Sequence, residues 1–238
     1  MKLKKTLKII TGIVVFLTLP SLLFFGYVYF KYHEDLPIGT NPEQADLLAQ
    51  KMLNALDYDA YKNTNYIEWM FESKRYYKWK KSKQTCLVYW KDYKVDLNLT
   101  DYSLSKAYIH NFSVEGDIGN DLIDKAIKYF NNDSFWLVAP YKVFDDGTLR
   151  SIVKLDDGTD GLLVTYTSGG TTPGDSYLWH LDSTGKPTSF QIWASVLPFD
   201  GIKASWTDWV TTETGAQLPT LHRLLFLGIE NNDIKTSF

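Results

Sequence analysis

Tyr93-Lys94-Val95-Asp96-Leu97-Asn98-Leu99 is the stretch of the sequence that decides the fold. Its odd-numbered side chains are apolar or aromatic, and its even-numbered side chains are charged or polar. Successive side chains of a β-strand point to opposite faces of the sheet. The alternation therefore predicts an antiparallel strand with one buried face and one wet face.

Similar runs, rich in aromatic and β-branched residues and bounded by turn signals, lie on both sides of this stretch. With residues 93–99 they predict strands at 66–72, 76–81, 85–91, 105–112, 149–155, 161–167, 176–182, 188–196, 203–211 and 221–229. No strand alternates regularly with a helix, so a parallel sheet is not expected. We expect a mainly β domain of the α+β class, in which a strongly curved antiparallel sheet of about 10–11 strands forms a half-barrel.

Two helices are expected to plug the open side of this half-barrel. The first has a start signal at Asn41-Pro42, where Asn41 can cap the helix and Gln44 completes a capping-box spacing. Apolar residues at helical spacing follow it. The second is expected to begin at Asn120 and to end near Asn131-Asn132, before an apolar segment at 135–141.

The first thirty residues indicate the cell compartment. Four lysines precede an uncharged, mostly apolar run from Ile9 to Phe30. At ~1.5 Å per helical residue this run reaches roughly 30 Å, the thickness of the hydrocarbon core of a bilayer. No small-x-small cleavage site follows it, so we expect an uncleaved signal anchor, although a long signal peptide cleaved at an unusual place remains an alternative.

The positive-inside rule places the amino terminus in the cytoplasm and the remaining chain outside it. The sequence thus predicts a basic cytoplasmic tail at 1–8, a transmembrane anchor at 9–31, a tether at 32–41 and one domain at 42–238. The expected location is the inner, cytoplasmic membrane, with a single pass and a periplasmic or extracytoplasmic domain.

Composition excludes some classes of protein. The net charge of −3 argues against a general nucleic-acid partner, and one cysteine, Cys86, cannot form an internal disulfide. The common hydrolase, metalloprotease, redox and nucleotide-binding motifs are missing, so neither catalysis nor a cofactor or metal is expected. Asp175 is expected either to cap a turn or to accept hydrogen bonds from buried Tyr or Trp side chains.

Two segments carry a resemblance to a known family: Asp133-Ser134-Phe135-Trp136-Leu137-Val138-Ala139-Pro140-Tyr141-Lys142 and Thr172-Pro173-Gly174-Asp175-Ser176-Tyr177-Leu178-Trp179. Together with the helix-then-meander order, they resemble the periplasmic lipoprotein-carrier superfamily, with its LolA/LolB-like half-barrels, and its relatives in Bacteroidetes-type bacteria. The resemblance implies a bacterial source and an apolar cavity that receives lipid or lipoprotein acyl chains. An anchored chain departs from those carriers, which puts shuttling between membranes in doubt.

Aromatic residues make up 16% of the chain and are the candidates for such a cavity. They either fill the core or form an apolar wall for a ligand. The candidate ligand-binding residues are Trp69, Trp79, Trp90, Trp136, Tyr141, Tyr177, Trp179, Trp193 and Trp206.

Three functions remain open from the sequence. The first is a membrane-tethered domain that binds a lipid-like or acylated ligand. The second is a structural domain that presents a face or an edge to an envelope protein partner. The third is an enzyme with a site built from scattered residues such as Asp175 and His180, which requires these side chains to converge in one cleft.

Overall fold

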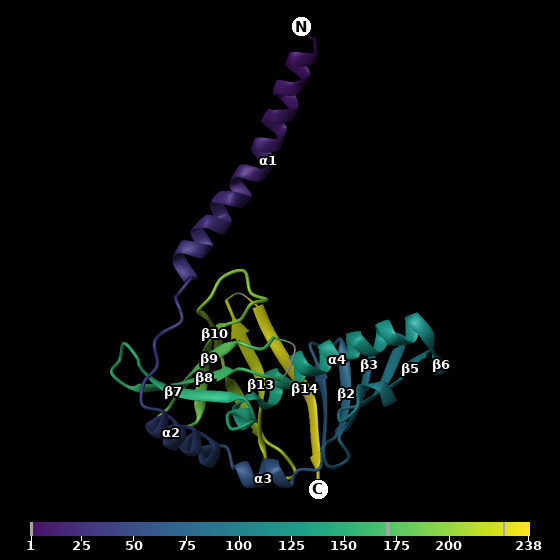
Figure 1. The fold of residues 1–238 in the computed structure, drawn as a ribbon, viewed down its shortest axis with the longest axis vertical. Helices are drawn as coiled ribbons and strands as arrows, with labels where there is room; N and C mark the ends of the chain where they lie inside the picture. Colours follow the sequence, from purple (N-terminus) through teal and green to yellow (C-terminus); the bar gives the residue numbers. More distant parts are fainter. Residues whose placement is uncertain (1, 170–171, 226) are drawn as a thin grey trace.

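The computed structural model describes residues 2–169, 172–225 and 227–238 (Figure 1). Within these residues, fourteen strands form one antiparallel sheet that does not close, with β6 and β7 as its edges. The expected α+β class and antiparallel pairing are confirmed, whereas the expected strand number of about 10–11 is too low.

The first half of the sheet is a meander that begins after the first two short helices of the domain. Its strands are β1 (Tyr66–Phe71), β2 (Arg75–Lys80), β3 (Thr85–Trp90), β4 (Tyr93–Asn98), β5 (Lys106–Ile109) and β6 (Phe112–Val114). In β4, Val95 and Leu97 are fully buried while Asp96 is exposed, as the alternation predicts.

The second half of the sheet is another meander, and the last strand joins the two. Its strands are β7 (Thr148–Lys154), β8 (Asp160–Tyr166), β9 (Ser176–Leu181), β10 (Pro187–Trp193), β11 (Ile202–Ser205), β12 (Thr207–Thr211), β13 (Gln217–Leu224) and β14 (Leu227–Ser237). Strand β14 pairs with β13 on one side and with β1 on the other. The end of the chain therefore holds the two meanders together.

Three expected strands are each divided into two, which explains the difference in number. The run 105–112 breaks at His110 and Asn111, whose φ angles of 48° and 68° form a tight turn without glycine. The run 203–211 breaks at Trp206, and 221–229 breaks after Leu224. None of these breaks contains glycine or proline, the strongest sequence signals of a turn.

Helix α2 (Pro42–Ala55) packs on β7 and β8 through Ala45, Ala49, Met52 and Leu53. Pro42 occupies the first turn as expected. The predicted cap is wrong: Asn41 has a left-handed φ of 48°, and its side chain makes no capping hydrogen bond. A short helix that the sequence did not predict, α3 (Tyr58–Asn63), follows, and the Asp57 carboxylate accepts a bond from its Ala60 amide at 3.2 Å.

Helix α4 (Gly116–Val138) crosses the face of the sheet from the β6 edge to the centre (Figure 1). Both predicted ends are wrong, since it begins before Asn120 and continues through Asn131-Asn132 into the segment expected to leave it. Asparagine is a weak helix former, but burial of Asp133, Ser134, Leu137 and Val138 stabilises the last turns. A 3-10 helix, η3 (Ala139–Lys142), follows.

Helix α1 (Lys2–Tyr32) projects away from the domain as a rod (Figure 1). Its segment Lys4–Tyr32 is long and apolar enough to cross a membrane, and its apolar stretch is not buried against any other described residues. Such a helix is compatible with either a signal sequence or an anchor, and it fits an envelope location.

Candidate functional site

A cavity of about 440 Å³ lies between the C-terminal half of α4, η3 and strands β8–β10. It falls within the roughly 300–1,000 Å³ typical of small-molecule sites. Its lining is rich in aromatic side chains and carries polar groups toward η3 and the β8–β9 loop. A second hollow of about 480 Å³, between β12 and β14, is lined largely by Thr, Asn and acidic residues. The aromatic cavity is therefore the better candidate for an apolar ligand.

The apolar wall of the cavity comes from segments far apart in the sequence. Helix α4 contributes Phe135 and Trp136, while β8 and β9 contribute Tyr166 and Tyr177. The Phe135 ring centroid lies 4.7 Å from that of Tyr177 and 5.7 Å from that of Tyr166. Trp79 reaches the same cavity from β2 and meets Phe130 edge-on at 5.3 Å. These rings contact one another and still leave space between them.

Two polar atoms in this wall lack a partner among the described residues. The Tyr166 hydroxyl and the Trp79 indole nitrogen are both buried from solvent without a hydrogen bond. Leaving such a group unsatisfied costs about 1–3 kcal/mol. Burial raises the pKa of Tyr166 well above its ordinary value, so the phenol stays protonated and able to donate. Both rings border the cavity, but these two atoms themselves present almost no surface to it.

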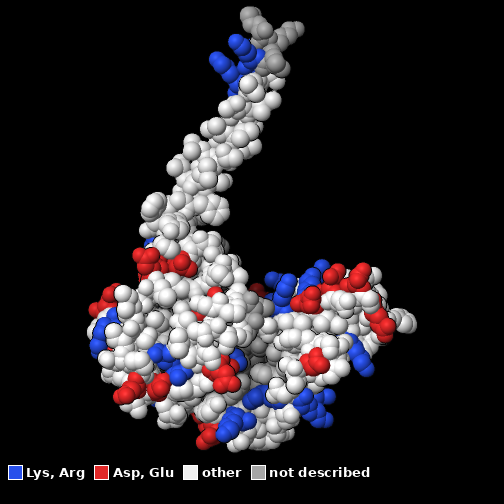
Figure 2. All heavy atoms as spheres, in the orientation of Figure 1, with Lys and Arg blue, Asp and Glu red and all other residues white. Residues whose placement is uncertain are grey.

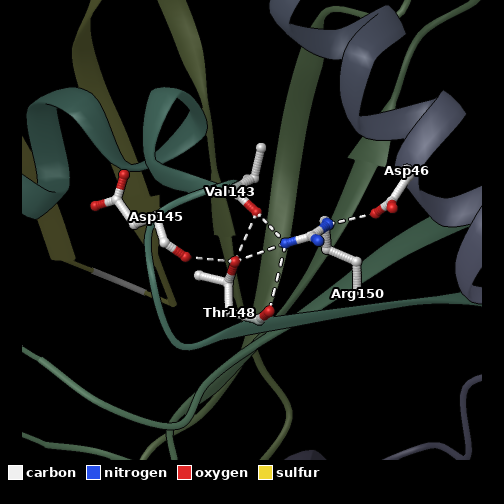
Figure 3. Close-up of polar contacts among 5 residues, drawn as sticks. All are labelled: Asp46, Val143, Asp145, Thr148 and Arg150. Atoms are coloured by element: carbon white, nitrogen blue, oxygen red, sulfur yellow. Dashed lines mark hydrogen bonds and ion pairs between the residues drawn. The ribbon is translucent and has the colours of Figure 1, made fainter.

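The polar end of the cavity includes Lys142, Asp145 and Asp146. Lys142 forms an ion pair with Asp145 across the turn that follows η3. The same turn is held from behind by two side chains of β7, as Figure 3 shows. Thr148 donates from its hydroxyl to the Asp145 carbonyl at 2.8 Å, and the Arg150 guanidinium donates to the Val143 carbonyl at 2.9 Å.

Arg150 also joins this turn to helix α2. Its Nε donates to the Asp46 carboxylate at 2.5 Å, and its Nη1 donates to the Thr148 hydroxyl at 2.6 Å (Figure 3). One side chain thus connects α2, β7 and the turn after η3. The network fixes the position of the charged groups at the polar end of the cavity.

The rim of the cavity is formed partly by the β8–β9 loop, of which residues 170–171 lie outside the described residues. Asp175 is buried, accepts a bond from the Thr172 hydroxyl and accepts a second from the Ser195 amide at 3.2 Å. Of the two roles left open by the sequence, it therefore takes the turn-capping one. It also joins this loop to the loop after β10.

Two buried polar clusters fix α4 above the sheet. In the first, Asp133 is fully buried, pairs with the guanidinium of Arg75 and accepts a bond from the Tyr77 hydroxyl. Burial and then the Asp133 charge raise the pKa of Tyr77, so the phenol remains a donor. Arg75 also lies 4.6 Å from the Tyr129 ring centroid.

The second cluster lies under the C-terminal end of α4. The fully buried His222 ring has Nε2 2.7 Å from the Trp136 carbonyl oxygen and Nδ1 3.0 Å from the Ser205 carbonyl oxygen. Asn231 donates to the same Trp136 carbonyl at 3.2 Å. Burial lowers the pKa of His222 to about 4, despite the opposing effect of the two carbonyls. The imidazole is therefore neutral near pH 7.

The structure divides the nine candidate ligand-binding residues. Trp79, Trp136 and Tyr177 line the cavity. Among the others, Trp193 lies on the opposite face of β10 in a small cluster with Val153, Leu163 and Leu178. The remaining five pack within the main core: Trp69, Trp90, Tyr141, Trp179 and Trp206. Ligand binding by the three cavity residues stays a prediction.

Sequence reasoning missed several residues of the site. Phe135 and Tyr166 gave the same aromatic signal as the candidates. Lys142 lies in the segment that carries the family resemblance, but nothing there marked it as a residue of the cavity. Asp175 lines the cavity, whereas His180 is not among its lining residues and contacts the Gln191 side chain at 3.2 Å. These two residues therefore do not meet in the aromatic cavity.

Comparison with known proteins gives a limited result. No model of a protein family matches the chain, and no curated protein matches it. Among solved structures, the fold is similar to a DUF1329 family protein from Desulfovibrio piger, with 13% identity, a TM-score of 0.41 and coverage of 83% of this chain and 94% of that one.

It is also similar to a putative outer membrane lipoprotein-sorting protein domain from Vibrio parahaemolyticus. Here the identity is 8% and the TM-score 0.37, with coverage of 79% of this chain and 93% of that one. The resemblance expected from the sequence is thus met in part, at low identity. At these scores neither likeness assigns the chain to a family.

Proposed function

We propose that this protein is a membrane-anchored, extracytoplasmic half-barrel that binds one lipid-like or acylated ligand in its aromatic cavity. The observation that carries the proposal is the arrangement of Trp79, Phe135, Trp136, Tyr166 and Tyr177 around one space of about 440 Å³. Burial of apolar surface contributes about 25 cal/mol per Å², so a hydrocarbon chain is favoured there over a polar metabolite.

The polar groups of the cavity define the kind of ligand further. The Tyr166 hydroxyl and the Trp79 indole are buried donors without a partner among the described residues, and Lys142 lies toward the polar end. An amphiphile with a hydrocarbon chain among the rings and ester, amide or acid oxygens near these donors uses both features. Contact with these donors requires either ring to rotate toward the cavity, after which the donor gains the partner that it lacks.

The anchor part of the proposal rests on α1. Four lysines precede an apolar helix whose exposed side chains are not covered by any part of the chain that the structure describes. A bilayer supplies that cover, and the lysines favour a cytoplasmic amino terminus. The domain is then held at the outer surface of the membrane, where lipid-like ligands are abundant.

Native mass spectrometry of the full chain, purified in mild detergent and followed by organic extraction, tests the proposal. We expect one lipid or acylated molecule per chain. Ala194 lines the cavity and is 6% exposed, so Ala194→Phe should fill part of the space and reduce ligand occupancy at least tenfold. Leu149→Phe, at a position 63% exposed on β7, is the matched control and should leave occupancy unchanged.

The experiment also separates the alternative of an interaction domain. Strand β6 is an edge of the sheet with Phe112 78% exposed, and an edge presents backbone groups to which a partner strand can pair. Stable copurification of one envelope protein with an empty cavity would support that alternative. Equal ligand occupancy in Ala194→Phe and the parent protein would show that the ligand binds elsewhere.

A further inference from the structure

The segment between α1 and the domain is bound to the sheet. The Glu34 amide donates to the Asp200 carbonyl at 3.1 Å, and the Glu34 carbonyl accepts from the Trp193 indole at 2.8 Å. His33 Nδ1 accepts from the Asp200 amide at 3.1 Å. A Cβ on Gly201 would lie 2.6 Å from the Glu34 Cβ, so the two backbones approach closely.

Contacts at both ends of this segment extend the attachment. Thr40 and Ile152 exchange two backbone hydrogen bonds of 2.9 and 2.7 Å at the β7 edge. At the other end, the ring of Tyr32, the last residue of α1, stacks on Phe199 with centroids 6.4 Å apart. The direction in which α1 leaves the domain is therefore set by the fold, and with it the side of the domain that lies beside the helix exit.

Two apolar loops lie on that side. The loop 194–201 follows β10, and Val196 within it is 72% exposed. Leu225 and Leu227 flank the turn between β13 and β14 and are 43% and 54% exposed. Because Ala204 pairs with Leu224, this turn is at the same end of the sheet as the loop 194–201. We name these two loops the exit face; they lie near the base of α1 (Figure 1).

The exit face is also part of the wall of the aromatic cavity. Ala194, Val196 and Leu197 line the cavity, although Val196 remains largely exposed. The same loop therefore contacts the base of α1 through Phe199 and borders the proposed ligand space. A ligand that enters beside Val196 crosses little water if this loop touches a membrane.

We propose that the exit face rests on the outer surface of the bilayer that α1 spans, so that the cavity opens toward lipids of that leaflet. This inference rests on the proposed function, because it requires α1 to remain as an anchor. The occupant is the lipid surface, since exposed apolar side chains lie on the side of the domain from which an apolar helix leaves.

The charges near the exit face are mixed. The acidic residues Glu34, Asp35 and Asp200 lie at the base of α1, and the basic residues Lys203 and Arg223 lie on the adjoining strands β11 and β13. Figure 2 shows acidic atoms gathered directly below the helix and mostly uncharged surface beside them. Anionic lipids should therefore give no gain in contact over zwitterionic phosphatidylcholine.

Fluorescence quenching in proteoliposomes tests the inference. The full chain, carrying Val196→Cys or Leu227→Cys, is labelled with a polarity-sensitive dye and reconstituted in phosphatidylcholine with or without headgroup-proximal spin-labelled lipid. Native Cys86 is fully buried, and burial raises its pKa, so the parent protein should not label. The matched control is Phe112→Cys, an exposed apolar position on β6.

We expect spin-labelled lipid to lower the fluorescence of the dye at positions 196 and 227 at least twofold. At position 112 the fluorescence should fall by less than one tenth. Replacing a third of the phosphatidylcholine by phosphatidylglycerol should leave these values unchanged. Unquenched dye at both 196 and 227 overturns the inference, and so does equal quenching at all three positions.

Leu227 does not line the cavity, so quenching of the dye at 227 reports membrane contact whether or not the cavity holds a ligand. Quenching at 196 and 227 with an empty cavity would retain the orientation of the domain while rejecting ligand binding. An intact mass that lacks the first thirty residues after expression would instead reject the anchor. A full-length, ligand-bound chain with unquenched dyes would reject the exit face alone.

Discussion

The two halves of the sheet are both antiparallel meanders, yet α4 packs against them differently. Over β4 and β5 it packs closely, and Ala107 and Ala126 are buried with almost no exposed surface. Beside β8–β10 its last turns leave a cavity of about 440 Å³, bounded by Phe135 and Trp136. Small side chains permit close approach of a helix to a sheet, whereas rings that meet edge-on keep the layers apart. The comparison shows that one helix both completes a core and forms the wall of a site.

The largest effect on stability is expected from removing the buried carboxylate that holds α4 against the first half of the sheet. Asp133→Ala leaves Arg75 partly buried without its carboxylate and Tyr77 without its acceptor. Loss of one partner from such a pair should lower the free energy of unfolding by about 3–5 kcal/mol. Urea titration followed by circular dichroism measures this change.

The double variant Asp133→Leu with Arg75→Leu is the control for that experiment, because it removes both charges. It should recover at least half of the lost stability. If the single variant unfolds at the same urea concentration as the parent protein, Asp133 does not fix α4.

The next largest effect on stability is expected from His222, which lies under the end of α4 that borders the cavity. His222 has a folded-state pKa of about 4, below the ordinary value of 6.5, so the unfolded chain binds more protons between these two pH values. Its contribution to stability is complete above pH 6.5 and is lost as the pH falls toward 4. The difference of about two and a half units between the unfolded and folded pKa values corresponds to about 3 kcal/mol in the free energy of unfolding.

Urea titrations of the parent protein and His222→Gln at several pH values test this expectation. Other groups titrate over the same range, so the informative quantity is the difference between the two proteins. That difference should narrow as the pH falls from 6.5 to 4. A constant difference would mean that His222 does not titrate with unfolding.

The smallest effect on stability is expected from the Asp46–Arg150 ion pair, which lies beside the polar end of the cavity. The Asp46 carboxylate is half exposed, so its pair with Arg150 should contribute less than about 1 kcal/mol. Asp46→Asn should therefore leave the urea midpoint nearly unchanged at physiological salt. Arg150→Gln also removes the bond to the Val143 carbonyl and should cost more than Asp46→Asn.

The sequence predicted the strands well because alternation is a local property. The positions of β1–β4 and β7–β10 agree with the expected strands to within one or two residues at most ends. Turns without glycine, as at His110-Asn111, escaped prediction because neither glycine nor proline marks them in the sequence. The end of α4 escaped it because asparagines favour a stop, and only contacts with the sheet continue the helix.

The candidate site could be predicted only in part. Aromatic content selected nine residues, and three of them line the cavity. Trp193 lies away from the cavity because its neighbour Ile192 faces it, so Trp193 points to the opposite face and bonds the Glu34 carbonyl. Which face of a strand is concave cannot be read from the strand itself.

By itself, the sequence determined the period of the strands, the apolar length of α1 and the basic charge before it. These follow from side-chain polarity along short stretches of chain. Only the tertiary structure decided that β14 joins the two meanders and that Trp79, Tyr166 and Tyr177 line one cavity. It also decided that contacts of residues 33–40 set the direction in which α1 leaves the domain. Those features depend on sheet curvature and on the path of α4, which arise from contacts between residues distant in the chain.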